Sequence, residues 1–178
     1  MALYNIKDNF LTETNRLKIK KRLEESTLWG KFGDREAFTF TFIKNNIPED
    51  FKAFVTQKHN VYQFVALKVK EGGAIEDHID DDFAESFKKY QPGAIVGLPE
   101  TTVYYVDIDN SMKGGNLIVE GETIKPTTNK AVILSPGCSH KVSNMEAGCN
   151  PRLTIVCEKY RILSKFLPHI KTPNYKSG

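Results

Sequence analysis

Short apolar runs separated by turn residues fill residues 101–144, TTVYYVDIDNSMKGGNLIVEGETIKPTTNKAVILSPGCSHKVSN. The runs are rich in β-branched and aromatic residues and are short, which is typical of strands. Turn chemistry at Thr127–Asn129 and at Pro136–Gly137 separates the later runs. Many short strands at regular spacing predict a sandwich or barrel rather than a parallel sheet.

The same pattern extends to both sides of this stretch. VYQFVALKVK ends just before Gly72 and Gly73, and RLTIVCEKYRI follows a turn at Gly148–Pro151. The predicted strands are residues 61–70, 101–108, 114–120, 122–126, 131–135, 139–143 and 152–162. We therefore expect a mainly β fold whose core spans residues 61–162.

The first 60 residues predict helix, strand, helix. Residues 14–26, TNRLKIKKRLEES, have the pattern of an amphipathic helix, and residues 36–44, EAFTFTFIK, alternate phenylalanine with threonine as a half-buried strand does. Pro48 opens a short helix that carries Phe51, Phe54 and Val55 on one side. The tail, residues 163–178, is expected to be loose after one docked turn.

Composition and length predict one soluble domain over residues 1–178. Charged residues make up 26% of the chain and the net charge is only +3, which argues against a nucleic-acid partner. No apolar run is long enough to cross a membrane, and MALYNIKDNF does not resemble a signal peptide. We therefore expect a cytoplasmic protein. Cys138, Cys149 and Cys157 are odd in number and lack zinc-binding spacing, so neither a disulfide framework nor a zinc site is predicted.

A candidate metal motif lies in VKEGGAIEDHIDDD. His78 and Asp80 are two residues apart, so on an extended chain their side chains point the same way and can reach one ion. His140, in SPGCSHKVSN, is a candidate third ligand. Two histidines and one carboxylate leave open metal positions, the arrangement that non-haem iron(II) oxygenases use. Without His140, the short motif would equally fit a surface acidic loop.

Arg152 begins the last strong predicted strand, RLTIVCEKY. An arginine that points into a β-sandwich is costly without an anionic partner. Its guanidinium forms two-pronged bonds with carboxylates. Arg152 is therefore suited to hold the far end of a dicarboxylate.

Taken together, these pieces resemble the 2-oxoglutarate/iron(II)-dependent oxygenases, especially their prolyl-4-hydroxylase-like branch. The resemblance covers residues 61–162. It is carried, in order, by HID (78–80), YYVDI (104–108), GGNL (114–117), TIKPTTNKAVILSPG (123–137) and NPRLTIV (150–156). It implies a double-stranded β-helix, a jelly-roll or cupin-like sandwich, with supporting N-terminal helices over residues 1–60.

The resemblance also implies roles for individual residues. His78, Asp80 and His140 correspond to the iron ligands, and Arg152 to the residue that pairs with the far carboxylate of 2-oxoglutarate. Tyr105 corresponds to a hydroxyl that supports this carboxylate, with a plain core aromatic as the alternative. Lys68 lies where some relatives place a tyrosine near the metal. Fe(II), 2-oxoglutarate and O2 are the implied reactants, with ascorbate as a reductant.

Two positions indicate which branches of this family the chain resembles less. Halogenating relatives carry a small residue in place of the metal-binding carboxylate, whereas this chain has Asp80, which favours hydroxylation. Alkylation-repair relatives carry a second arginine where this chain has Glu158, which disfavours nucleic-acid substrates.

The implied reaction is hydroxylation of an unactivated C–H bond, on a prolyl or other peptidyl residue, with release of succinate and CO2. A free amino acid or other small metabolite is the alternative substrate. A non-catalytic jelly-roll binding module and a cupin-type enzyme that does not use 2-oxoglutarate also remain open. Residues 81–100 form a polar, partly helical insert beside the metal motif, which is either a lid or a plain connection.

Overall fold

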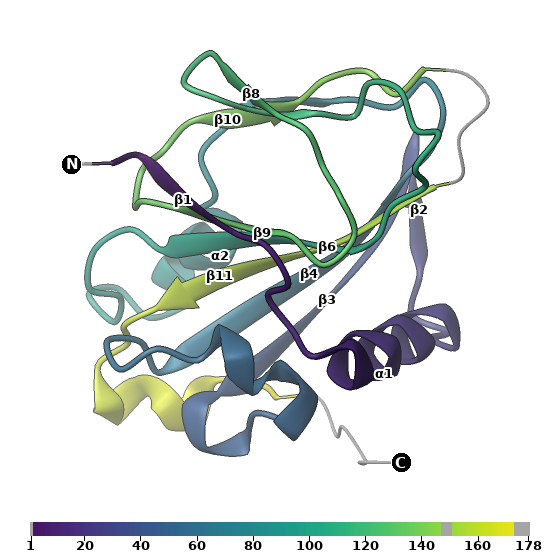
Figure 1. The fold of residues 1–178 in the computed structure, drawn as a ribbon. Coiled ribbons are helices and arrows are strands. Elements are labelled where there is room, and N and C mark those ends of the chain that lie inside the picture. The colour runs from purple at the N-terminus through teal and green to yellow at the C-terminus, as the bar shows by residue number, and fades with distance from the viewer. Residues whose placement is uncertain (1, 147–150, 173–178) are drawn as a thin grey trace.

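Two antiparallel sheets and a layer of helices form the protein in the computed structural model, which describes residues 2–146 and 151–172 (Figure 1). The large sheet contains, in spatial order, β1 (Tyr4–Lys7), β9 (Ala131–Leu134), β6 (Glu100–Asp107), β11 (Arg152–Tyr160), β4 (Val61–Val69), β3 (Arg35–Ile43) and β2 (Gly30–Phe32). The small sheet contains β5 (Ile75–His78), β10 (His140–Val142), β7 (Leu117–Val119) and β8 (Glu122–Ile124). The predicted double-stranded β-helix is confirmed.

Helices from the first 60 residues pack on the face of the large sheet that points away from the small sheet (Figure 1). The helices of residues 82–90 and 164–169 pack instead around Val61 and Tyr160, at one end of the large sheet. The helical segments are α1 (Glu13–Glu24), α2 (Asp82–Tyr90) and the 3-10 helices η1 (Lys44–Asn46), η2 (Glu49–Phe54) and η3 (Ser164–His169). The helix predicted over residues 14–26 is α1, whose first turn is capped by the Thr12 hydroxyl. The short helix predicted after Pro48 is η2, which buries Phe51 and Phe54 but has 3-10 geometry. None of the helices within the described residues is long and apolar enough to cross a membrane.

The large sheet separates two apolar cores because residues on each strand alternate between its faces. Phe40 and Phe64, on β3 and β4, stack on the helix side with ring centroids 5.1 Å apart. Cys157 is fully buried in this core, as expected of a small apolar residue. Val103 and Leu117 belong to the second core, between the two sheets. The site residues lie on that inter-sheet side.

Three strands were not expected from the sequence. The first 60 residues supply β1 and β2 in addition to the predicted β3, so they extend the large sheet as well as bracing it. β5 was also missed, because IEDH has no apolar alternation. β5 is held instead by its pairing with β10. The turn predicted at Gly148–Pro151 and the end of the tail lie partly outside the described residues, and Cys149 lies wholly outside them.

Gly114 and Gly115 form a tight turn that precedes β7. Both have positive φ, 69° and 62°. A Cβ on Gly114 would lie 2.0 Å from the Asn144 carbonyl oxygen, so a larger residue does not fit there.

Asn129 ties the N-terminal segment to the large sheet. Its side chain accepts hydrogen bonds from the Leu11 amide and the Tyr104 hydroxyl, and donates one to the Leu11 carbonyl. Its φ of 66° lies in the left-handed region, which Asn adopts more readily than most other residues with a side chain. We expect Asn129→Ala to lower the free energy of unfolding by about 2–4 kcal/mol, because it leaves buried polar groups unpaired. Urea denaturation measures this, and a change below about 0.5 kcal/mol would contradict it.

Candidate metal and cosubstrate site

Two histidines on adjacent short strands face each other at the rim of the small sheet. His78 ends β5 and His140 begins β10, and the two are register partners in the antiparallel pair. Their ring centroids are 4.4 Å apart. This pairing explains how residues far apart in the sequence come to share one site.

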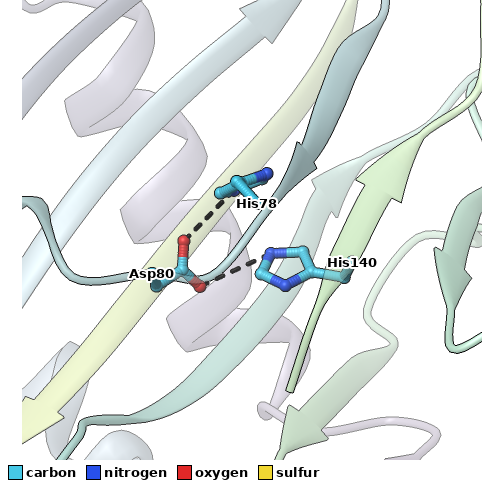
Figure 2. Close-up of side chains that lie close together, drawn as sticks. All are labelled: His78, Asp80 and His140. Carbon is cyan, nitrogen blue, oxygen red and sulfur yellow. Dashed lines mark ion pairs between the residues drawn. The ribbon is translucent and has the colours of Figure 1, made fainter. Parts of the chain in front are cut away.

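Asp80 completes the group from the loop between β5 and α2. Its two carboxylate oxygens each face one imidazole, with His78 Nε2 at 3.3 Å from Oδ1 and His140 Nε2 at 3.4 Å from Oδ2 (Figure 2). One donor atom from each of the three residues lies within 4.8 Å of the others. This separation suits a single ion held by all three side chains.

Backbone carbonyls orient both imidazoles. His78 Nδ1 lies 2.8 Å from the Glu76 carbonyl oxygen, and His140 Nδ1 lies 3.2 Å from that of Cys138. An Nδ1–H that donates to each carbonyl leaves the Nε2 lone pair pointing at the Asp80 carboxylate. Metal-binding histidines are commonly oriented in this way.

Electrostatics favour the protonation states that a metal needs. Burial alone would raise the pKa of Asp80, but His78 and His140 outweigh it, so its pKa is lowered and it stays ionised. Burial lowers the pKa of His140, so this imidazole is neutral at pH 7. Oδ2 of Asp80 is buried and has no hydrogen-bond partner among the described residues. A carboxylate with a buried oxygen that lacks a hydrogen-bond partner among the described residues, flanked by two imidazoles, fits a divalent cation well.

A cavity of about 170 Å³ opens beside this group, between the two sheets. It is lined by Arg35, Val65, Leu67, Ile75, His78, Ile79, Asp80, Val103, Leu117, His140, Val142, Arg152, Thr154, Val156 and Glu158. Its walls are largely apolar, with charged groups at a few points. This is the usual composition of a small-molecule site.

Arg152 lies deep in this cavity and is only 1% exposed. Its Nε and Nη2 atoms are buried and have no hydrogen-bond partner among the described residues. Leaving charged donors unpaired in the interior is costly, so an anionic ligand is expected here. The role of Arg152 as a carboxylate anchor stays a prediction.

Tyr105 lies next to Arg152. The Arg152 guanidinium carbon is 5.0 Å from the centroid of its ring, and the Tyr105 hydroxyl is buried with no partner among the described residues. Burial raises the pKa of Tyr105, so the hydroxyl remains a donor. This is the arrangement expected of a second donor to the same carboxylate. Tyr104, the preceding residue on β6, is fully buried in the core on the helix side.

The structure does not support the role suggested for Lys68. Lys68 alternates along β4 with Leu67, which lines the cavity, so it points to the opposite face of the sheet. Its ammonium group lies 4.0 Å from the centroid of the Trp29 ring. Lys68 therefore lies on the helix side of the large sheet, and the candidate cosubstrate site lies on the other side.

The sequence analysis noted Glu158 only because alkylation-repair relatives carry an arginine at this position, and did not predict that it lines the cavity. Glu158 is 3% exposed and lines the same wall as Arg152. Strand alternation could have placed it there, because positions 152, 154, 156 and 158 of one strand share a face.

No known family's sequence model matches this chain, and no curated protein sequence matches it either. Solved structures do match. An oxidoreductase of the 2OG-Fe(II) oxygenase family from Burkholderia pseudomallei has a TM-score of 0.63 and 12% identity, and the match covers 89% of this chain and 84% of that one. The viral collagen prolyl hydroxylase from Paramecium Bursaria Chlorella virus-1, in its 2OG complex, has a TM-score of 0.60 and 11% identity, covering 91% and 97%. A Trichoplax adhaerens prolyl hydroxylase, in complex with a hypoxia inducible factor peptide, has a TM-score of 0.58 and 13% identity, covering 89% and 83%.

The fold is that of the 2OG-Fe(II) oxygenases. At such low identity the likeness concerns the fold alone, and chemistry has to be argued from the site. On this oxygenase fold the chain gathers a His-Asp-His group, a buried arginine and a buried tyrosine around one cavity.

Proposed function

We propose that the chain is an Fe(II)- and 2-oxoglutarate-dependent dioxygenase that hydroxylates an unactivated C–H bond. The observation that carries this proposal is the shared cavity. A buried guanidinium with two unpaired donor atoms faces the same small space as a three-residue group suited to a metal. A metal-binding module without 2-oxoglutarate, or a plain binding module, would leave Arg152 buried without a partner.

The residues then have distinct tasks. His78, Asp80 and His140 would hold Fe(II), leaving positions for the 2-oxo acid and for O2. Arg152 and Tyr105 would bind the far carboxylate and so orient the cosubstrate. Bound iron and 2-oxoglutarate together supply the oxidant, with succinate and CO2 as the co-products. The apolar walls, including Val103 and Leu117, keep water out of the reacting space. Ascorbate would serve as a reductant that keeps the iron in its Fe(II) state.

The substrate is proposed to be a prolyl or other peptidyl residue. The Trichoplax prolyl hydroxylase, which has a similar fold, is in complex with a peptide, and this supports a peptide substrate here. Ile79, which lines the cavity and is 47% exposed, offers an apolar contact at its rim. A free amino acid or small metabolite is the second candidate, favoured by the small volume of the cavity. Residues 81–100, which include α2, are proposed to act as a lid over this opening.

Anaerobic mixing of the protein with Fe(II) and 2-oxoglutarate tests the proposal without a known substrate. We expect a visible metal-to-ligand charge-transfer band that requires both additions. His78→Ala removes one metal ligand, so the band should disappear while circular dichroism shows an unchanged fold. A folded wild-type protein that gives no band would contradict the proposed function and favour a cupin-like or purely binding role.

A further inference from the structure

Arg35 is a second arginine in the wall of the cavity. It begins β3, and its register partner on β4 is Val69, which in turn pairs with Arg152 on β11. Register partners in a sheet share a face, so both arginines point to the inter-sheet side. They are two strands apart, which places their Cα atoms about 10 Å from each other. Two long side chains that start this close can reach the same small space.

The charged groups that line the cavity are unevenly distributed. The carboxyl groups in its lining, within the described residues, belong to Asp80 and Glu158. Asp80 is part of the candidate metal group, and Glu158 lies six residues along β11 from Arg152. The end of the cavity beside Arg152 is therefore lined by two cations, Arg35 and Arg152.

Asp34 is the counter-ion of Arg35. The Nε atom of Arg35 donates to Asp34 Oδ1 at 3.1 Å, and Nη2 donates to the Ala74 carbonyl oxygen at 3.0 Å. Asp34 Oδ2 accepts a hydrogen bond from the Ala74 amide at 3.1 Å, which is the main cause of the lowered pKa of Asp34. Asp34 is thus ionised at pH 7 and offsets part of the positive charge of Arg35. The offset is partial, because these bonds use two of the five N–H donors of a guanidinium.

We infer that Arg35 is a second specificity-determining cation for the cosubstrate, and that with Arg152 it favours 2-oxo acids whose far end is negatively charged. The inference rests on the proposed function. Arg152 has two buried donor atoms without a hydrogen-bond partner among the described residues, so it would bind the far carboxylate directly. Arg35 adds a positive charge at the same end of the cavity. The charge acts at a distance there, because a protein interior screens it less than water does.

The same contacts could instead serve only the fold. Ala74 directly precedes β5, the strand of His78, and both of its backbone groups are held by side chains of the β2–β3 hairpin. In a purely structural role, the loss of Asp34 and the loss of Arg35 would affect the cavity in the same direction. In the cation role their effects are opposite, because Arg35 supplies positive charge and Asp34 offsets it.

Arg35→Met and Asp34→Asn should therefore change the affinity for 2-oxoglutarate in opposite directions. We expect the Kd, from anaerobic titration of the charge-transfer band, to rise about 10-fold in Arg35→Met and to fall about 2-fold in Asp34→Asn. Asparagine keeps an acceptor oxygen for the Ala74 amide, so the contact with the hairpin is retained. A Kd that rises in both variants, or that changes in neither, would overturn the inference.

Two further variants control for net charge and for shape. Lys31→Met removes one positive charge from the same hairpin, but Lys31 is exposed and points to the other face of the sheet, so the Kd should not change. Arg35→Lys keeps the charge and loses the planar guanidinium, and we expect it to restore most of the affinity lost in Arg35→Met. A Kd for Arg35→Lys as high as that of Arg35→Met would overturn the inference.

A neutral ligand tests the specificity itself. 2-Oxoglutaramate carries an amide in place of the far carboxylate and has nearly the same size. We expect Arg35→Met to weaken 2-oxoglutarate binding and to leave 2-oxoglutaramate binding as it is in the wild type. Equal losses for the two ligands would overturn the inference, since Arg35 would then support only the shape of the cavity.

The charge-transfer band separates the two levels of failure. A wild-type protein that forms the band, with an unchanged Kd in Arg35→Met, would overturn the inference and leave the dioxygenase proposal standing. A wild-type protein without the band would overturn both.

Discussion

Replacing Arg152 by methionine should weaken 2-oxoglutarate binding about 30-fold or more and leave the free energy of unfolding unchanged or higher. Methionine keeps an unbranched chain beside the Tyr105 ring but removes the guanidinium. Nε and Nη2 of Arg152 have no hydrogen-bond partner among the described residues, and none of the ion pairs in that part of the chain includes this arginine. Replacing a buried charge by an apolar side chain is often neutral or stabilising.

Two measurements on Arg152→Met distinguish a role of Arg152 in 2-oxoglutarate binding from a role in stabilising the fold. KM for 2-oxoglutarate, from succinate release or from titration of the anaerobic band, should rise, while urea denaturation of the ligand-free protein should show no loss. Arg161→Met, at an exposed position just beyond β11, is the matched control and should change neither quantity. A large loss of stability in Arg152→Met with an unchanged KM would mean that this arginine is a structural residue.

Asp80→Ala should reduce 2-oxoglutarate turnover on the order of 10³-fold, because metal-ion catalysis supplies several kcal/mol and the variant loses the one anionic ligand. The two histidines that remain are neutral donors on adjacent strands. They offer a much weaker site for a divalent cation. Removal of a carboxylate whose Oδ2 has no hydrogen-bond partner in the described part of the chain should change the unfolding free energy little.

Iron retained after gel filtration and succinate released at saturating 2-oxoglutarate are the two readouts for Asp80→Ala. Glu76→Ala provides the control, since Glu76 is exposed on the same strand as His78 and only its backbone carbonyl contacts the imidazole. Wild-type iron content in the Asp80 variant would show that the ion is held elsewhere.

The sequence predicted the long strands because each carries its own pattern. Residues 36–44 alternate phenylalanine with threonine, and residues 61–70 and 152–162 are apolar runs with turns at their ends. These became β3, β4 and β11, each within two residues of the expected bounds. The short strands β1, β2 and β5 carry no such pattern, since pairing with neighbours rather than local composition defines them.

The sequence analysis placed together the site residues whose side-chain chemistry is distinctive. It failed for residues whose place in the site depends only on the strand face on which they lie. His78, Asp80 and His140 lie together as expected, although their binding of a metal stays a prediction. Lys68 was assigned by sequence distance from His78, which ignores the face of the strand on which it lies. Glu158 was passed over because the sequence does not show that it shares a cavity with Arg152.

The candidate site residues are distributed over both sheets, and the two sheets differ in strand length and packing. Arg152, Tyr105 and Glu158 belong to central strands of the large sheet, which is backed by its own aromatic core, whereas the candidate metal ligands His78 and His140 lie on strands of four and three residues. Since the core of Phe40, Phe64 and their neighbours contains none of the candidate ligands, we expect the large sheet to fold without the ion. The protein should therefore survive a period of iron starvation folded, and be ready to take up the metal again when the supply returns.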